Sequence, residues 1–218
     1  MRISPFLLPL VILAFSSPIT GGATEQILFK SDFCLGITNG WKNVKLYKHK
    51  TDYSVLTDGT NCYVHAIAED SCSALTAKLH LKPGGRLILR WRWRIEGVAN
   101  NGSERDLSRF DHAARVFVAF DTFIGPPRTL NYFWANNEKV GSMLEHPMTG
   151  RAEIFVVESG SERAGRWISE ERDVTADWKR AFPGRTMPKI EAVGMLTDGD
   201  SLGTRLSADY ADLELIEE

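Results

Sequence analysis

The sequence is poor in the residues that hold metal ions and carry covalent catalysis. Its 218 residues include three cysteines and five histidines, and no two histidines have the spacing of zinc ligands. A catalytic thiol needs a histidine partner, and the spacing identifies none. The sequence also lacks a Gly-rich phosphate-binding loop. These absences argue against a zinc enzyme, a cysteine hydrolase and a nucleotide-binding protein.

Charge of one sign is not in excess either. Lys and Arg number 26, Asp and Glu number 28, and the formal net charge is −2. Proteins that bind nucleic acid or an anionic membrane surface carry a basic excess, so neither partner is expected.

Long hydrophobic runs are absent except near the N-terminus. There Arg2 precedes an apolar run over residues 6–15, and Gly21 and Ala23 suit a cleavage site. The run is shorter than the roughly 20 residues that span a bilayer. We expect a signal peptide over residues 1–23, no transmembrane span in the mature chain, and a periplasmic or extracellular location. A short membrane anchor is the alternative.

An exported chain meets oxidising conditions, in which two of the three cysteines can pair. Cys62 and Cys72 flank "YVHAIAEDS", which reads as a hairpin, and are the first choice for a disulfide. Cys34 is the alternative partner, and its position in the sequence does not decide between the two pairings.

The mature chain consists of short β-type runs separated by turn residues, with no repeat and no linker that would divide it. One segment, "TADWKRAFPG", fits a short helix in which Thr175 is the cap and Pro183-Gly184 the stop. This pattern predicts an all-β fold: a single jelly-roll-like antiparallel β-sandwich over residues 24–218, with one short helix near the C-terminal third.

The run "RLILRWRWRIEG" predicts a strand with one core face and one arginine face. Strict alternation separates Leu87, Leu89, Trp91, Trp93 and Ile95 from the arginines between them. We expect neighbouring strands to align Arg90, Arg92 and Arg94 with Arg115, and Asp209 to lie at the mouth of a core-facing stripe. Arginines bind carboxylates through paired donors, so an anionic sugar or another carboxylate is the expected ligand. The alternative is an ion-pair network that only stitches the sheet.

A second candidate surface is the aromatic segment "LNYFWANNEK". Alternation puts Tyr132 and Trp134 on one face, and the strand ends at Asn136. An aromatic ring beside amide groups suits a sugar, whose C–H face stacks on the ring while its hydroxyls bond to the amides. The alternative is that one aromatic pair packs into the core. The predicted ligand-binding residues are therefore Arg92, Arg94, Arg115, Trp134, Asn136 and Asp209.

Two further clusters carry weaker predictions. In "TDGDSLGT", Asp198 and Asp200 offer the hard oxygen ligands of a calcium ion, and the alternative is a Gly-rich turn. No other cofactor is expected. Asp111 and His112 follow the long polar loop 96–112 and are the candidate catalytic pair, should the protein be a hydrolase or a lyase.

Several segments, in this order, resemble one bacterial family of exported proteins. They are "LILRWRWRIEG", "DHAARVFVAFD", "LNYFWANN", "GSMLEHPMTGRAEIFVVESG", "RWISEERDVTADWKRAF" and "AVGMLTDGDSLGTRLSADYADLEL". The family is a domain of unknown function, number 3047. The resemblance implies a jelly-roll sandwich similar in outline to sugar-binding and glycan-processing domains.

From this resemblance and the residue patterns together, we expect an exported protein that binds a carbohydrate or cell-envelope glycan non-covalently through one sheet face. The expected partner is a glycan or a small anionic ligand. A glycan-active hydrolase or lyase is the first alternative, and a structural or assembly protein of the cell envelope is the second.

Overall fold

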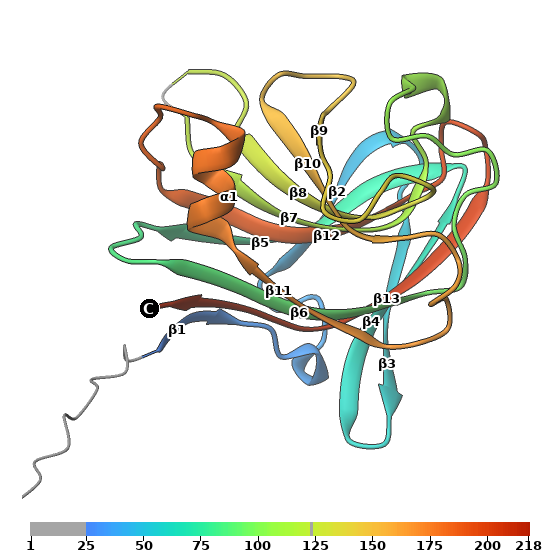
Figure 1. Ribbon diagram of the computed structural model, residues 1–218. Helices are drawn as coiled ribbons and strands as arrows, with labels where there is room; N and C mark the ends of the chain where they lie inside the picture. Colours follow the sequence, from blue (N-terminus) through green and yellow to red (C-terminus); the bar gives the residue numbers. More distant parts are fainter. Residues whose placement is uncertain (1–24, 123) are drawn as a thin grey trace, which may run out of the picture.

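The computed structural model describes residues 25–122 and 124–218, which form two β-sheets packed face to face (Figure 1). The expected signal peptide lies outside the described residues. No helix within the described ranges is long and apolar enough to cross a membrane.

One sheet has six strands in the order β11-β6-β13-β4-β3, and β1 pairs with β13 off this path. Its strands are β1 (Gln26–Lys30), β3 (Asp52–Asp58), β4 (Asn61–Glu69), β6 (Leu87–Ile95), β11 (Ile168–Asp173) and β13 (Arg205–Glu217).

The other sheet has seven strands in the order β2-β5-β12-β7-β8-β10-β9. They are β2 (Trp41–Lys48), β5 (Ser71–Leu81), β7 (His112–Phe120), β8 (Arg128–Ala135), β9 (Met143–Glu145), β10 (Ala152–Ser159) and β12 (Ile190–Asp198). All the named pairings are antiparallel except that of β8 with β10. The expected all-β, jelly-roll-like sandwich with one helix is confirmed.

The core lies between the sheets and is built from the alternation seen in the sequence. Leu87, Leu89, Trp91, Trp93 and Ile95 of β6 all point inward and are at most 2% exposed. Trp91 packs on Tyr132 and Trp93 on Trp134, with ring centroids 5.4 and 5.8 Å apart. Because Tyr132 and Trp134 belong to β8, these contacts join the two sheets and remove large aromatic surfaces from water.

The helix α1 (Val174–Ala181) covers one end of the sandwich (Figure 1). Its cap is Asp173, which accepts a hydrogen bond from the Ala176 amide at 2.8 Å. The prediction that Thr175 is the cap is wrong, because the helix and its cap begin two residues earlier. The Thr175 hydroxyl instead accepts from the Leu87 amide at 2.9 Å and ties the helix to β6. Two short 3-10 turns, η1 (Phe33–Leu35) and η2 (Leu107–Arg109), complete the elements.

The disulfide joins Cys34 to Cys62, with their Cα atoms 5.2 Å apart, and Cys72 is a buried free thiol. The first choice, Cys62 with Cys72, is wrong. The segment between them is not a hairpin: β4 belongs to the six-stranded sheet and β5 to the seven-stranded sheet. The chain crosses from one sheet to the other at Asp70, whose φ is 46°.

Candidate functional site

The face of the seven-stranded sheet that points away from the core is hollowed. Two hollows of about 430 and 410 Å³ share Leu46, Arg115 and His146, so they adjoin and form one groove. We refer to them as the first and the second hollow. The first is lined by Leu46, Tyr47, Cys72, Leu107, Phe110, Arg115, His146, Met148, Asp198, Asp200 and Ser201.

The second hollow owes its depth to small side chains on neighbouring strands. Its lining includes Ala74 of β5, Ala192 of β12, Ala119 of β7 and Ala152 of β10. Gly194 of β12 extends this pattern, because a Cβ there would lie 2.5 Å from Cζ of Phe117. The ring of Phe117 therefore reaches across β12 and forms part of the floor.

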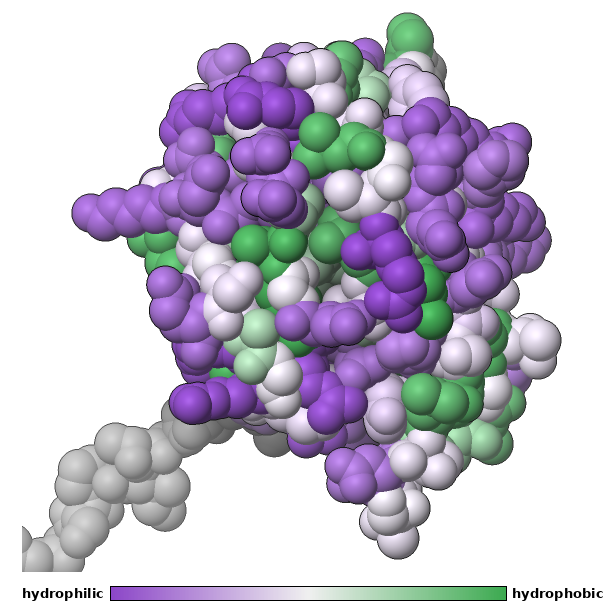
Figure 2. All heavy atoms as spheres, turned by 90° about the vertical axis from the view of Figure 1, so that its right-hand side faces the viewer, coloured by the Kyte–Doolittle hydropathy of each residue, from purple (hydrophilic) through white to green (hydrophobic). Residues whose placement is uncertain are grey.

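Hydrophobic side chains form much of the rim of the first hollow. Leu46 and Tyr47 come from β2, Leu107 from η2 and Met148 from a loop; each is between 46% and 52% exposed. Figure 2 views the loop-bearing end of the molecule, where hydrophobic residues gather around a central hollow within a mostly hydrophilic surface. Exposed apolar side chains around a concavity are typical of a binding site.

Arg115 lies where the two hollows meet. Its guanidinium carbon is 5.9 Å from the ring centre of Phe117 and 5.5 Å from that of Phe133. Its Nε is buried with no hydrogen-bond partner, and no carboxylate among the described residues forms a salt bridge with it. Burial lowers the pKa of Arg115. An arginine this far desolvated and left without an anion is costly for the fold.

Burial also shifts the pKa of three other groups that line the groove beside Arg115. Burial, and then the charge of Asp200, raise the pKa of Asp198. Burial raises the pKa of the Cys72 thiol as well. Burial and the charge of Arg115 lower the pKa of His146 to about 4. The guanidinium of Arg115 is thus a cation without a salt-bridge partner among the described residues, in a groove whose lining carboxyl groups are Asp198, Asp200 and Glu191.

Asp111, one of the two predicted catalytic residues, holds the turn that follows β12. Its buried carboxylate accepts hydrogen bonds from the amides of Ser201 and Leu202 at 2.8 and 2.9 Å, and from the Thr204 hydroxyl at 3.0 Å. Three donors occupy the carboxylate, so it shapes the wall of the first hollow rather than facing into it.

His112, the other predicted catalytic residue, is also buried and lies on the outer face of the sheet. Its ring stacks on Phe133 with centroids 4.3 Å apart, and its Nδ1 is 3.2 Å from the carbonyl oxygen of Phe110. Burial and the charge of Arg115 lower its pKa. The ring is thus a neutral packing group behind Phe110, and no step of catalysis is assigned to it.

Asn136 fastens the loop 96–112 and has no amide group left for a ligand. Its Oδ1 accepts from the Ala99 amide at 2.8 Å, while its Nδ2 donates to Glu104 at 2.9 Å and to the Asp111 carbonyl at 2.7 Å. The side chain is only 6% exposed. In this structure Asn136 is an anchor inside the protein, which corrects its predicted place on a binding face.

Trp134 is likewise inside the protein. Its ring has no exposed surface, and its indole nitrogen donates to the Gly160 carbonyl at 2.9 Å. This corrects the prediction that it forms a platform for a sugar. Alternation on β8 sends Tyr132 and Trp134 into the core and leaves Asn131 and Phe133 on the outer face, where Asn131 lines the second hollow.

Arg92, Arg94 and Asp209 lie on the six-stranded sheet, on the side opposite the groove. The expected alignment with Arg115 is wrong, since β6 and β7 belong to different sheets. Arg94 pairs with Asp209 at 2.6 Å, and Arg92 pairs with Asp212. Both guanidinium groups also lie over the ring of Trp167. These contacts match the ion-pair network that was the alternative; a ligand on this face stays a prediction.

Asp198 and Asp200, predicted to bind calcium, come together with Cys72. One ligand atom from each of the three lies within 4.8 Å of the others. The Asp200 carbonyl, however, already accepts from the Lys48 ammonium at 2.6 Å. Two carboxylates fall short of the six to eight oxygens that calcium takes. The calcium site therefore stays a prediction.

The same turn also contains a motif that resembles a hydrolase nucleophile. Gly199–Gly203 reads GDSLG and fits the G-x-S-x-G pattern of hydrolase nucleophiles. That pattern works at a strand-to-helix turn, whereas this turn joins the strands β12 and β13. The Ser201 hydroxyl donates to the Leu107 carbonyl at 3.4 Å, and within the described ranges no histidine is hydrogen-bonded to it. The five residues of the motif do not indicate whether a helix or a strand follows the turn.

Solved structures similar to this chain include carbohydrate-binding modules. TmCBM61, solved with beta-1,4-galactotriose, has a TM-score of 0.43 and 12% identity over 85% of this chain and 94% of its own. The CBM22-1 xylan-binding domain of Paenibacillus barcinonensis Xyn10C has a TM-score of 0.46 and 7% identity over 89% of this chain and 96% of its own. Likenesses at these TM-scores say nothing about the ligand of this chain.

No curated protein matches the sequence. Residues 39–214 do match one family, described as "Protein of unknown function (DUF3047)". The match covers most of the chain and includes all the strands from β2 to β12, among them those that line the groove. The chain therefore belongs to the DUF3047 family.

Proposed function

We propose that the protein binds a glycan non-covalently in the groove of the seven-stranded sheet. The observation that carries the proposal is the adjoining pair of hollows, which cross the sheet as one elongated concavity and suit an extended chain of sugar rings. Tyr47, Phe110 and Phe117 offer hydrocarbon and aromatic surface to the C–H faces of such rings. Arg115 and Asn131 offer hydrogen-bond donors to oxygen atoms.

We also propose that the protein is exported to the periplasm or beyond the cell, where glycans are met. The disulfide between Cys34 and Cys62 supports this location, because disulfides persist in oxidising compartments and are rare in the reducing cytosol. Export is tested by fractionating cells that express the full chain and by sequencing the N-terminus of the purified product. A product that keeps Met1 and stays in the cytosol would contradict the proposal.

The binding proposal is tested by isothermal titration calorimetry of the purified protein against soluble xylan, galactan, polygalacturonate and alginate oligosaccharides. Tyr47 is half-exposed on the rim of the first hollow, and Tyr47→Ala removes a ring without opening the core. We expect this change to weaken binding by about three- to tenfold, the range of one aromatic contact.

The matched control is Tyr63→Ala. Tyr63 packs on Trp167 on the outer face of the six-stranded sheet, away from the groove. We expect binding in this variant to equal that of the unchanged protein. If Tyr63→Ala or Arg92→Gln weakened binding and Tyr47→Ala did not, the binding face would be the six-stranded sheet and the groove proposal would be wrong. It would also be wrong if no glycan in the panel bound.

A further inference from the structure

We infer that the groove selects an acidic glycan, whose carboxylate pairs with the guanidinium of Arg115. The inference rests on the proposed function and adds to it the chemical class of the ligand. It is carried by the geometry around Arg115 and by a comparison with a second arginine in the same protein.

That second arginine, Arg172, has the same aromatic surroundings and a full set of partners. Its guanidinium carbon lies 5.7 Å from the ring centre of Tyr132 and 5.6 Å from that of Phe155. Two hydrogen bonds of 3.0 and 2.7 Å join it to the carboxylate of Asp177. The fold therefore supplies a carboxylate where a guanidinium between aromatic rings is only structural.

Arg115 lies between Phe117 and Phe133 in the same way, but no protein carboxylate occupies the position that Asp177 takes at Arg172. The open side of Arg115 instead faces both hollows. A carboxylate entering the groove would complete the arrangement already seen at Arg172, with two parallel hydrogen bonds to one guanidinium.

The acidic groups near Arg115 do not take this place. Asp198 and Asp200 both line the first hollow, and neither forms a salt bridge with Arg115. Cys72 is a neutral thiol, and His146 is a neutral imidazole. Arg115 thus lacks a paired carboxylate among the described residues at the place where the two hollows meet.

The remaining charged side chains in the second hollow are Lys78 and Glu191. Lys78 pairs with Ala192, and Glu191 precedes Ala192 on β12. Ala192 lies four residues along β12 from Leu196, the residue that pairs with Arg115. Four residues span about 13 Å along a strand, so the carboxylate of Glu191 does not neutralise Arg115. A neutral sugar over Arg115 would leave the guanidinium desolvated and unpaired, and discrimination against neutral glycans follows.

The experiment compares two ligands with the same sugar backbone: an oligogalacturonate, and the same oligosaccharide with its carboxylates converted to neutral methyl esters. Calorimetry at neutral pH and low salt gives both affinities, and an alginate oligosaccharide shows whether a second uronate is accepted. We expect the acid to bind at least tenfold more tightly than the ester, the range of a charge-assisted pair. Arg115→Gln should remove this preference, and Arg92→Gln should leave it unchanged.

The two proposals fail in different ways. If the ester bound as tightly as the acid, or if Arg115→Gln kept the preference, the glycan-binding groove would stand and the acidic class would be wrong. If neither ligand nor any neutral glycan bound, the proposed function itself would fail, and this inference with it.

A second measurement separates a ligand-binding arginine from a structural one. A guanidinium buried without a partner lowers stability, so Arg115→Gln should leave the thermal midpoint of the ligand-free protein unchanged or raise it. The matched variant Arg172→Gln breaks a buried ion pair with Asp177 and should lower the midpoint. If Arg115→Gln lowered the midpoint as much as Arg172→Gln, Arg115 would be structural and the inference would be wrong.

Discussion

Asp111 shows how much one buried side chain can shape the groove, since it alone accepts three hydrogen bonds from the turn after β12. Asp111→Ala leaves these donors without their acceptor. We expect the free energy of unfolding to fall by roughly 2 to 4 kcal/mol, measured by urea denaturation. Asp52→Ala, at an exposed position on β3, is the control and should change it by less than about 0.5 kcal/mol. An unchanged stability in Asp111→Ala would contradict the anchoring role.

Gly194 is the second residue whose replacement has a definite expected effect. In Gly194→Ala the new Cβ would lie 2.5 Å from Phe117 Cζ and 2.7 Å from the Leu75 carbonyl oxygen, and the latter is fixed backbone. We expect a loss of about 1 to 3 kcal/mol in unfolding free energy. Gly150→Ala, where nothing lies within 4 Å of the added Cβ, should be close to neutral. Equal midpoints for the two variants would show that Phe117 does not need this glycine.

At the level of single residues, the sequence predicts much of the packing and little of the site. Alternation identifies Trp91 and Trp93 as core, and both are buried. It also favours Trp134 and Asn136 as ligand contacts, because a strand pattern tells which side chains share a face but not whether that face is covered. Arg115 lines both hollows, and its contact with a ligand stays a prediction; its neighbours in the groove come from strands whose pairing the sequence does not reveal.

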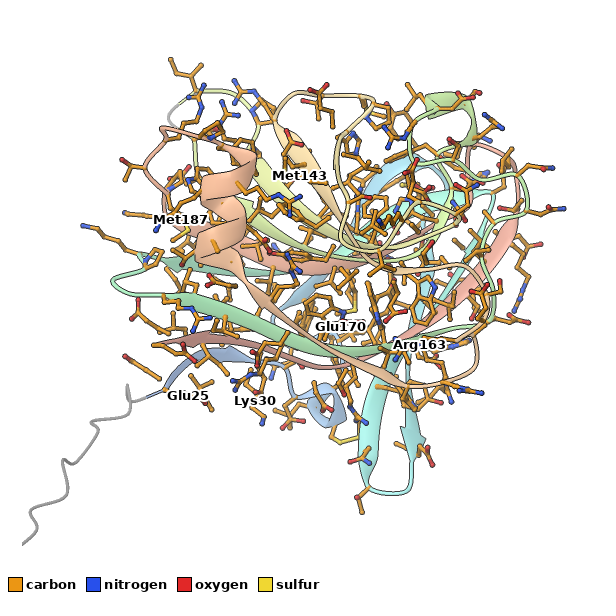
Figure 3. All side chains as sticks on the ribbon, in the orientation of Figure 1. Glu25, Lys30, Met143, Arg163, Glu170 and Met187 are labelled. Carbon is orange, nitrogen blue, oxygen red and sulfur yellow. A yellow bond between two sulfur atoms is a disulfide. The ribbon has the colours of Figure 1, made fainter. Side chains whose placement is uncertain are left out.

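The strand β11 gives an expected pH dependence. Glu170 points from this edge strand toward the space between the sheets (Figure 3), where it accepts from the Trp93 indole at 3.1 Å and faces Glu158, Arg163 and Arg172. Burial, and then the charge of Glu158, raise its pKa from 4.5 to about 7. The folded protein therefore binds more protons than the unfolded chain between these values, and stability falls as pH rises from about 4.5 to 7.

Thermal unfolding at pH 5 and pH 8 measures this effect. In Glu170→Gln the side chain is neutral at both values, so we expect a smaller drop in midpoint between pH 5 and pH 8 than in the unchanged protein. Glu171→Gln, at the neighbouring exposed position, serves as the control and should keep the full drop. A drop that was the same in Glu170→Gln would show that other groups cause it.

Strand existence is predictable in this chain, and sheet membership is not. The β6 and β7 segments both alternate clearly and both carry arginines on the face away from the core. Alternation does not indicate which sheet a strand joins, so the predicted alignment of Arg92 with Arg115 does not follow from it. The order of strands depends on long-range pairings such as β6 with β13, which the local pattern does not encode.

For the molecule as a whole, the disulfide between Cys34 and Cys62 links the segment before β2 to β4, 28 residues apart. Constraining a loop of this length stabilises the folded state by about 3 to 4 kcal/mol. We expect reduction to lower the thermal midpoint by about 10 °C. The double variant Cys34→Ser/Cys62→Ser should match the reduced protein and show no further response to reductant. A response in that variant would place the effect elsewhere.

The groove and the core are separated by a single sheet, and this has an evolutionary consequence. On β7, Val116 and Val118 face the core, whereas Arg115, Phe117 and Ala119 face the groove. Substitutions at the alternate positions that line the groove, Gly194 excepted, therefore change the shape and charge of the groove without disturbing the packing beneath it. Members of one family built on this sandwich can diversify their ligands at nearly constant stability, and the divergence should concentrate at every second residue of β5, β7 and β12.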